Sequence, residues 1–440
     1  MCELHPEKTF MLSRVSNTMK AKVDSFSPIK TIAFRANRRF YKLLLMSSLS
    51  VFFSPISITG FAPEHGFLSS QLGNVIQAYE TDFPSWETDK QPQLAIVGVE
   101  EDRASINNNG TDKAPDAVRK HLYALYQGDY TMNIVDLGNI KAGNTIQDTY
   151  IALKSVVEEL VKENILPIII GGGQDLTYAQ YLGYQNLERK IELAIIDARF
   201  DLDEENAENV SLNSRSYVNH IILHQPDYLF NLNAIAYQTY LVSKESIHMY
   251  DKLFFNATRV GMIAGKMDQS EPLIRAADLI SFDIGAIRAS EAPGNANAMP
   301  NGLFGDEACQ LARYAGMSDK CSSIGFYEFN PTFDPMEQTA MLVSQMIWCF
   351  IDGYYNRKQD TPLYPKSSYI IYRTTLENEE HELVFVKSKK SDRWWIQVPY
   401  FGSKSVNERY YLVPCRYEDY QLAVSGEMPD LWWKTHQKLQ

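Results

Sequence analysis

Apolar and polar positions alternate in blocks from about residue 92 onward. Short, nearly continuous apolar runs are separated by longer stretches in which apolar residues recur at helical spacing. Continuous apolar runs bounded by polar residues predict strands that are buried on both faces of a sheet. The runs that predict strands are Leu94–Val99, Met132–Leu137, Leu166–Ile170, Leu193–Ile196, Arg259–Ile263, Leu279–Phe282 and Ser323–Tyr327.

The stretches between these runs predict helices. Ala114–Tyr126 has Pro115 in its first turn, where the missing N–H costs nothing. Thr145–Glu163 carries apolar residues at helical spacing, and Asp306–Ala315 and Pro335–Tyr354 are further helical stretches. Strands alternating with helices predict an α/β domain of three layers, with a mainly parallel sheet covered by helices on both faces.

The pattern changes on either side of this region and predicts three parts. We expect residues 1–45 to be a disordered basic tail, or to lie upstream of a true start at Met46. Residues 46–360 form the α/β domain. Residues 361–440 follow a polar linker and are aromatic and strand-like, with four of the six tryptophans in the chain. They predict a small β-rich extension that the tryptophan pairs anchor.

Charge and composition restrict the class of protein. The net charge of the 440 residues is −12, and the first 42 residues carry +6, which leaves −18 for the remainder. An acidic body argues against a nucleic-acid partner. The apolar run Leu43–Phe53 is well short of the roughly 20 residues of a membrane span. Five scattered cysteines are typical of free thiols in a reducing compartment, so we expect a cytoplasmic protein.

Three polar segments each follow a predicted strand, at the strand ends where parallel sheets bind ligands. Two-residue spacing on an extended chain would direct positions 197, 199 and 201 to one side, and would pair 283 with 285. An aspartate after a strand often caps the next turn, so one such motif alone carries no function. The segments are GGGQDLT at 171–177, DARFD at 197–201 and SFDIGAIR at 281–288.

These segments resemble, in order, the metal-binding motifs of the arginase–agmatinase–formimidoylglutamase family, the ureohydrolases. The family motifs are GGDHS or GGGH, then DAHxD, then SxDxDxxD. Flanking segments extend the resemblance over residues 92–356, among them 97–102, 114–119, 292–294 and 325–331. The resemblance implies an arginase-like fold and hydrolysis of a guanidino or formimidoyl carbon by hydroxide on two Mn²⁺ ions. GGGxD is nearest to the formimidoylglutamase motif.

The resemblance places the metal ligands at Gln174, Asp197, Arg199, Asp201, Asp283 and Gly285. Only the three aspartates match, and they are the ligands if a metal is retained. Gln174 and Arg199 replace histidines, Gly285 replaces an aspartate, and Arg288 replaces the last aspartate of the third motif. A permanent cation at 4 Å repels a divalent ion by roughly 8 kcal/mol at an effective dielectric of 20. We therefore expect Arg199 and Arg288 to replace the metal charge, with Arg199 paired to an aspartate.

The leading hypothesis is a member of this family that has lost its binuclear site, needs no cofactor and acts as a binding or scaffold protein. The alternative is an active linear-amidine hydrolase that uses Mn²⁺, with a substrate such as formimidoylglutamate. A third is different chemistry in the same cleft. We expect Asn213 and Glu328 to contact a substrate, with Asp175, Asn295 and Asn297 as further polar groups. We expect a protein partner through residues 361–440, and a homo-oligomer because family members are commonly trimers or hexamers.

Overall fold

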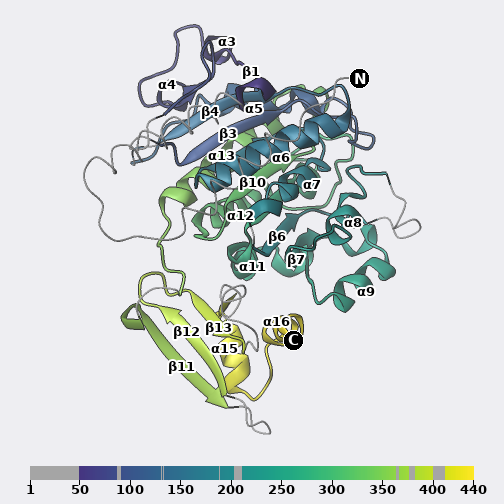
Figure 1. Cartoon of the computed structure of the whole chain (residues 1–440), viewed down its shortest axis with the longest axis vertical. Helices are drawn as coiled ribbons and strands as arrows, with labels where there is room; N and C mark the ends of the chain where they lie inside the picture. The colour runs from purple at the N-terminus through teal and green to yellow at the C-terminus, as the bar shows by residue number, and fades with distance from the viewer. Residues whose placement is uncertain are drawn as a thin grey trace, which may run out of the picture.

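In the main sheet, neighbouring strands come from segments that are far apart in the sequence (Figure 1). The computed structural model describes residues 49–86, 91–129, 131, 133–187, 189–202, 211–362, 366–375, 382–399 and 412–440, so the expected tail 1–45 lies outside the described residues. The strands run β1-β4-β3-β5-β10-β9-β6-β7-β8, with β2 also paired to β4, and all pairs except β1–β4 are parallel.

The strands of the main sheet confirm most of the predicted runs. They are β1 (Phe53–Ser54), β2 (Gln77–Ala78), β3 (Leu94–Val99), β4 (Ile134–Ile140), β5 (Leu166–Ile170), β6 (Ile191–Ile196), β7 (Leu229–Tyr237), β8 (Asn256–Arg259), β9 (Leu279–Asp283) and β10 (Ser323–Tyr327). The prediction for 259–263 was wrong, because β8 ends at Arg259 and Val260–Ile263 forms a short helix, α10. A short apolar run does not by itself distinguish strand from helix.

Helices cover both faces of the sheet, as the alternation predicts. One face carries α5 (Ala114–Leu122), α11 (Glu271–Ala276), α12 (Gly305–Met317) and α13 (Gln338–Tyr355). The other carries α6 (Ile146–Lys162), α7 (Leu176–Leu182), α8 (Tyr217–Ile222) and α9 (Lys244–Lys252). The short helices α3 (Ile58–Phe61) and α4 (Leu72–Val75) precede β3. The start of α6 is fixed by a capping box, in which Thr145 and Asp148 satisfy each other's backbone N–H groups.

The C-terminal extension is a separate antiparallel sheet with two helices. Trp394 and Trp432 are buried in its core, whereas Trp433 is 50% exposed. Trp432 lies on a helix, so this part is less purely β than the sequence indicated. The elements are β11 (Tyr369–Thr375), β12 (Glu382–Ser388), β13 (Trp394–Gln397) and β14 (Leu412–Cys415), paired in that order, then α15 (Tyr417–Val424) and α16 (Asp430–Leu439).

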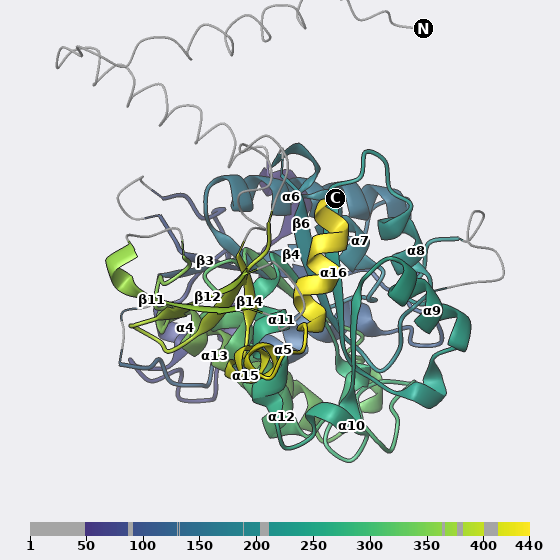
Figure 2. The same ribbon diagram turned by 90° about the horizontal axis from the view of Figure 1, so that it is seen from below.

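The extension docks where β7 and β8 begin, and Figure 2 shows its strand β14 beside α11. Arg275 of α11 stacks on Trp395, with its guanidinium carbon 4.5 Å from the ring centroid. Its Nη2 donates to the carbonyl oxygens of Trp394 and Cys415, at 3.2 and 3.4 Å. From α16, Lys434 donates to the Phe255 carbonyl at 3.2 Å. Arg275 therefore joins the two parts by both aromatic and hydrogen-bonding contacts.

Candidate functional site

The three motif segments converge at the carboxyl ends of neighbouring strands. β5 leads into the glycine segment and Gln174, β6 leads into Asp197, and β9 ends in Asp283. Because β5, β10, β9 and β6 are adjacent in that order, the segments meet at one edge of the sheet. Glu328 follows β10 at the same edge. The sequence thus predicted the location of the cluster, though not its internal geometry.

The side chain of Gln174 lies between two of the aspartates and bonds to both. With the amide oriented to satisfy its neighbours, its nitrogen donates to Oδ2 of Asp197 at 3.0 Å and to Oδ2 of Asp201 at 3.1 Å. The amide oxygen accepts from the hydroxyls of Tyr217 at 3.1 Å and Ser281 at 3.3 Å. Gln174 is fully buried, so these four bonds satisfy the whole amide away from water. A neutral donor therefore joins carboxylates that the resemblance assigns to metal.

Two of the aspartates also cap their own turns. Oδ1 of Asp197 accepts from the backbone N–H of Arg199 at 3.0 Å, and Oδ1 of Asp283 accepts from the backbone N–H of Gly285 at 2.6 Å. Each bond runs from an aspartate oxygen to the residue two positions on, which is the geometry of an Asx-turn. Local backbone groups consequently use carboxylate oxygens that would otherwise face a ligand.

Burial raises the pKa of two of the three aspartates in this cluster. Burial, and then the charge and hydrogen bond of Asp197, raise the pKa of Asp201 well above its usual range. Burial, and then the charges of Asp197 and Glu328, likewise raise the pKa of Asp283. The charge of Arg215 lowers both pKa values only in part, because like charges at close range disfavour ionisation.

The ion pair predicted for Arg199 does not form, although the charges of Asp201, Asp197 and Asp283 act on its guanidinium. No ion pair joins Arg199 to a carboxylate in the described part of the chain, although Arg199 lines the cavity beside the cluster. β6 ends at Ile196, and Asp201 has a left-handed φ of 47°, so alternation along an extended strand does not apply to 197–201. Arg288 is turned away, with its guanidinium 3.3 Å from the Phe304 ring centroid and bonded to the Gly302 carbonyl.

Arg215 is the cation nearest the cluster, which the sequence analysis did not identify. Its Nη1 lies 3.7 Å from Oδ1 of Asp201. The acidic groups around it raise the pKa of Arg215 despite its burial, whereas burial and the neighbouring Arg215 lower the pKa of Arg199. Arg215 begins no recognisable motif and follows β6 by almost twenty residues, so only the fold brings it to this edge.

The two residues expected to contact a substrate, Glu328 and Asn213, are both bonded to protein groups, and only Glu328 lines the cavity beside the cluster. The Glu328 carboxylate accepts from Ser105 at 2.9 Å, from Asn108 at 2.7 Å and from the Gln174 backbone at 2.9 Å, so protein donors already occupy it. Asn213 does not line the cavity beside the cluster but borders a neighbouring surface hollow, and its Oδ1 accepts from the Arg215 backbone.

The remaining polar positions are engaged to different extents, and Oδ1 of Asp175 has no hydrogen-bond partner among the described residues. Asp175 is buried away from this cavity, where it accepts from the Tyr150 hydroxyl at 2.7 Å. Burial raises the pKa of Asp175 to about 7. Asn295 and Asn297 line the cavity, and Asn295 accepts from the Asn297 backbone at 2.7 Å.

The cavity beside the cluster is small. Its volume is about 20 Å³, which is room for roughly one water molecule. It is lined by Asp197, Arg199, Arg215, Asp283 and Glu328 with backbone around Gly285. A molecule the size of an amino acid does not fit without movement of these side chains.

The donor set does not fit a binuclear manganese centre. In the ranges that the structure describes, no group of three or more His, Cys, Asp or Glu side chains is arranged to hold a metal ion. Gln174 fills the space between Asp197 and Asp201 with N–H donors, which point their positive ends where a cation would lie. Gly285 supplies no side chain, and Arg199 adds a cation at the cavity wall.

Comparisons with known proteins agree with this architecture. The sequence model described as the arginase family matches residues 92–352, and the chain belongs to that family. A formimidoylglutamase of Staphylococcus haemolyticus is 26% identical over 273 residues, covering 59% of this chain and 85% of that protein.

Solved structures show the same fold at lower sequence identity. The formimidoylglutamase of Bacillus subtilis aligns with a TM-score of 0.58 at 19% identity, over 66% of this chain and 92% of that one. The formiminoglutamase of Trypanosoma cruzi, solved with Mn²⁺, aligns with a TM-score of 0.57 at 17% identity, over 65% and 99%. The chain is thus a formimidoylglutamase-like member of the arginase family with an additional C-terminal sheet.

Proposed function

We propose that this arginase-family protein has lost its binuclear manganese site and acts as a non-catalytic binding or scaffold protein. The single observation that carries the proposal is the Gln174 amide, which donates to Asp197 and Asp201 at 3.0 and 3.1 Å. The hydrolysis that the family resemblance implies uses hydroxide formed on bound divalent ions. Hydrogen-bond donors between the carboxylates oppose such an ion, and a cavity of about 20 Å³ leaves little room for a substrate.

The test compares metal uptake with turnover in the intact chain. We expect no Mn²⁺ to remain after dialysis of the loaded protein, and no ammonia, formamide or urea from formimidoylglutamate, agmatine or arginine. Elemental analysis and product assays measure the two quantities. Stoichiometric Mn²⁺ with turnover would instead establish the alternative, an active hydrolase like the related formimidoylglutamases.

A restored variant supplies the positive control. We expect Gln174→His, Arg199→His and Gly285→Asp together to recover Mn²⁺ binding. A Cβ at Gly285 would meet only side-chain atoms of Asp283 and Asn295, at 3.1 to 3.4 Å, so the backbone accepts a side chain there. A matched triple at exposed sites, Gln310→His, Arg373→His and Gly261→Asp, makes the same chemical changes away from the cluster.

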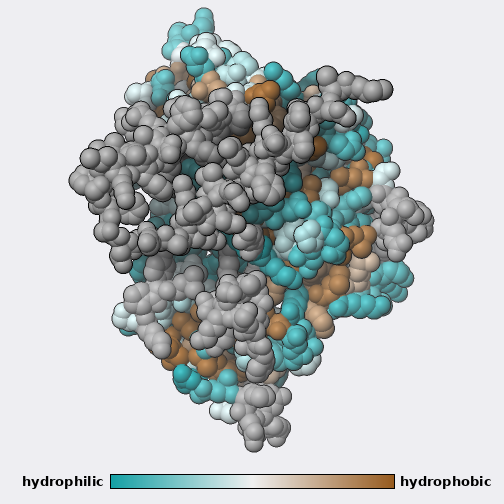
Figure 3. Space-filling model, in the orientation of Figure 1, coloured by the Kyte–Doolittle hydropathy of each residue, from teal (hydrophilic) through white to brown (hydrophobic). Residues whose placement is uncertain are grey.

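We further propose that residues 361–440 bind a protein partner and that the protein is cytoplasmic. On β11, Ile370 and Ile371 are 40% and 44% exposed, and Figure 3 shows hydrophobic residues gathered over the extension. Exposed apolar side chains on an edge strand are typical of pairing surfaces. No helix within the described ranges is long and apolar enough to cross a membrane. A pull-down in which Ile370→Lys with Ile371→Lys keeps every partner would contradict the binding role.

A further inference from the structure

A larger cavity lies at the opposite edge of the main sheet, where β5, β6 and β10 begin. Its volume is about 430 Å³, within the range of small-molecule sites. Leu166 is the first residue of β5, Arg189 precedes β6 and Ser322 precedes β10, so all three come from strand starts. The aspartate cluster is at the strand ends, so this cavity is separate from it.

Arg357 is held on one side of this cavity by neutral groups. Its Nε donates to the Gly316 carbonyl at 2.8 Å and its Nη2 to the Cys321 carbonyl at 3.0 Å. The guanidinium carbon lies 4.3 Å from the Tyr354 ring centroid. Among the described residues no carboxylate lies within ion-pair distance of Arg357, and burial lowers the pKa of Arg357. The guanidinium is therefore fixed in place and carries a charge without a close anionic partner in the described ranges.

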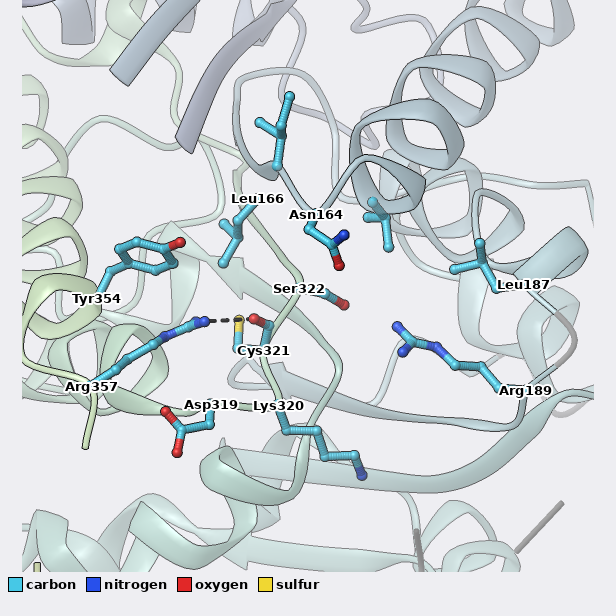
Figure 4. A pocket seen from close by; sticks show the side chains of 12 residues that line it. Asn164, Leu166, Leu187, Arg189, Asp319, Lys320, Cys321, Ser322, Tyr354 and Arg357 are labelled. Carbon is cyan, nitrogen blue, oxygen red and sulfur yellow. Dashed lines mark hydrogen bonds between the residues drawn. The ribbon is translucent and has the colours of Figure 1, made fainter. Parts of the chain in front are cut away.

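Arg189 lies across the cavity, and Figure 4 shows the two guanidinium groups directed toward its centre from opposite sides. Its one ion pair is long, with Nη2 3.8 Å from Asp278. Its Nε is buried and has no hydrogen-bond partner in the described chain. Because this nitrogen is out of reach of solvent, a ligand would contact the accessible part of the guanidinium, on a side chain that is 35% exposed.

The other charged groups at the cavity are already paired. Lys320 donates to Glu192 at 2.6 Å and lies 3.3 Å from Asp278. Asp319 accepts from the backbone of Gln359 and Asp360, at 3.3 and 2.9 Å, at the start of the linker. Arg357, whose charge also interacts with that of Asp319, and Arg189 are thus the lining cations without a close ion pair among the described residues.

The wall between the two arginines is aliphatic. Val161, Ile165, Leu166 and Leu187 line it, with the Asn164 amide and the Ser322 hydroxyl as polar groups. A compact anion such as inorganic phosphate would contact only one arginine. The aliphatic side chains of this wall would then remain exposed to water. Two carboxylates on a short aliphatic chain match both guanidinium forks and the apolar wall between them.

We propose that this cavity is a binding site for a small aliphatic dicarboxylate, one carboxylate on Arg357 and the other on Arg189. The site is independent of the aspartate cluster and of whether that cluster holds metal. Because Arg357 lies between α13 and the linker, the ligand would also bind where the main domain connects to the extension.

Calorimetry on the full chain tests the site with succinate, glutarate and adipate as probes. We expect at least one to bind, with a dissociation constant that rises tenfold or more in Arg357→Gln and several-fold in Arg189→Gln. Arg373→Gln, an exposed arginine on β11, is the matched control and should leave binding unchanged. Arg189 is partly exposed and makes one long ion pair, so Arg189→Gln should fold even if Arg357→Gln does not.

Further probes separate the alternatives. Butyrate, which has one carboxylate, should bind much more weakly than the best dicarboxylate. Glycerol 3-phosphate or inorganic phosphate binding as tightly would overturn the dicarboxylate assignment in favour of a phosphate site. An effect that sodium sulfate reproduces at equal ionic strength, or that persists in both variants, would mean an adventitious ion only and would overturn the site itself.

Discussion

The two edges of the main sheet carry charged side chains of opposite sign: aspartates at the strand ends and arginines at the strand starts. At the strand ends, an amide joins two of three buried aspartates beside a cavity of about 20 Å³. At the strand starts, two arginines without close carboxylate partners border a cavity of about 430 Å³. At the strand ends the space beside the aspartates is small, although a surface hollow of about 540 Å³ bordered by Arg199, Asp201 and Arg215 lies next to it. The strand starts carry a second cavity, at the edge where this fold class seldom binds ligands.

The largest expected effect is on the amide that joins the aspartates. Gln174→Ala removes the amide donor that Asp197 and Asp201 share and opens a cavity, so we expect the free energy of unfolding to fall by about 3 kcal/mol. Chemical denaturation measures this value. Gln310→Ala, on an exposed face of α12, is the control. A loss no greater than that of the control would mean that the amide does not hold the cluster together.

Arg275→Gln tests whether the C-terminal extension needs the contacts of Arg275 to stay docked on the main domain. The change removes the stack on Trp395 and weakens the bonds to the carbonyls of β13 and β14. We expect a loss of about 2 kcal/mol, together with faster proteolysis within residues 361–440. Arg313→Gln, which breaks a partly exposed ion pair on α12, is the control. Unchanged proteolysis would show that other contacts suffice to dock the extension.

Asp201→Asn should change the pH dependence of stability. Because the folded-state pKa of Asp201 is raised, its contribution is fully present below the unfolded pKa near 3.9 and is lost as pH rises through the folded pKa. The variant does not titrate there. The melting temperature of the variant minus that of the parent protein should therefore increase by roughly 2 °C as pH rises from 5 to 8.5. A constant difference across that range would contradict a raised pKa.

A further pH-dependent effect concerns the amino end of the sheet, where Lys438 contacts Phe255 and Asn231. Burial lowers the pKa of Lys438 to about 7. The unfolded lysine holds its proton to a higher pH, so this group destabilises the fold below about pH 7, and the cost fades as pH approaches the unfolded pKa. Lys438→Met should raise the melting temperature at pH 6 and lose that advantage by pH 10. Lys389→Met, in the hairpin after β12, should show no such trend.

Much of the fold was predictable because its strands are nearly unbroken apolar runs. β3, β5 and β10 begin and end at the predicted residues. β7 was not predicted, because Asn231 and Asn233 interrupt its apolar pattern although both are buried. Their amides bond to side chains of neighbouring segments, including Glu192 and Asn256, which a single sequence does not reveal.

The candidate site was predictable in position and not in its contacts. Motif order placed Gln174, Asp197 and Asp283 at one edge, and the sheet order brings them there. The chain turns after Asp197, so a spacing argument for an extended strand misplaced Arg199. Arg215 reaches Asp201 from a distant segment, and an amide that bridges two carboxylates depends on a rotamer that only the packed structure defines.

The bridging amide of Gln174 also bears on how far this protein depends on the supply of manganese in the cell. If the manganese site is lost as proposed, aspartates that are joined by a side chain of the same polypeptide would reach their final arrangement when the chain folds, without a metal ion. Such a protein would mature equally well under manganese starvation and manganese excess. Its abundance would then follow its synthesis and turnover alone, where a manganese-dependent hydrolase of the same fold would compete for a scarce nutrient.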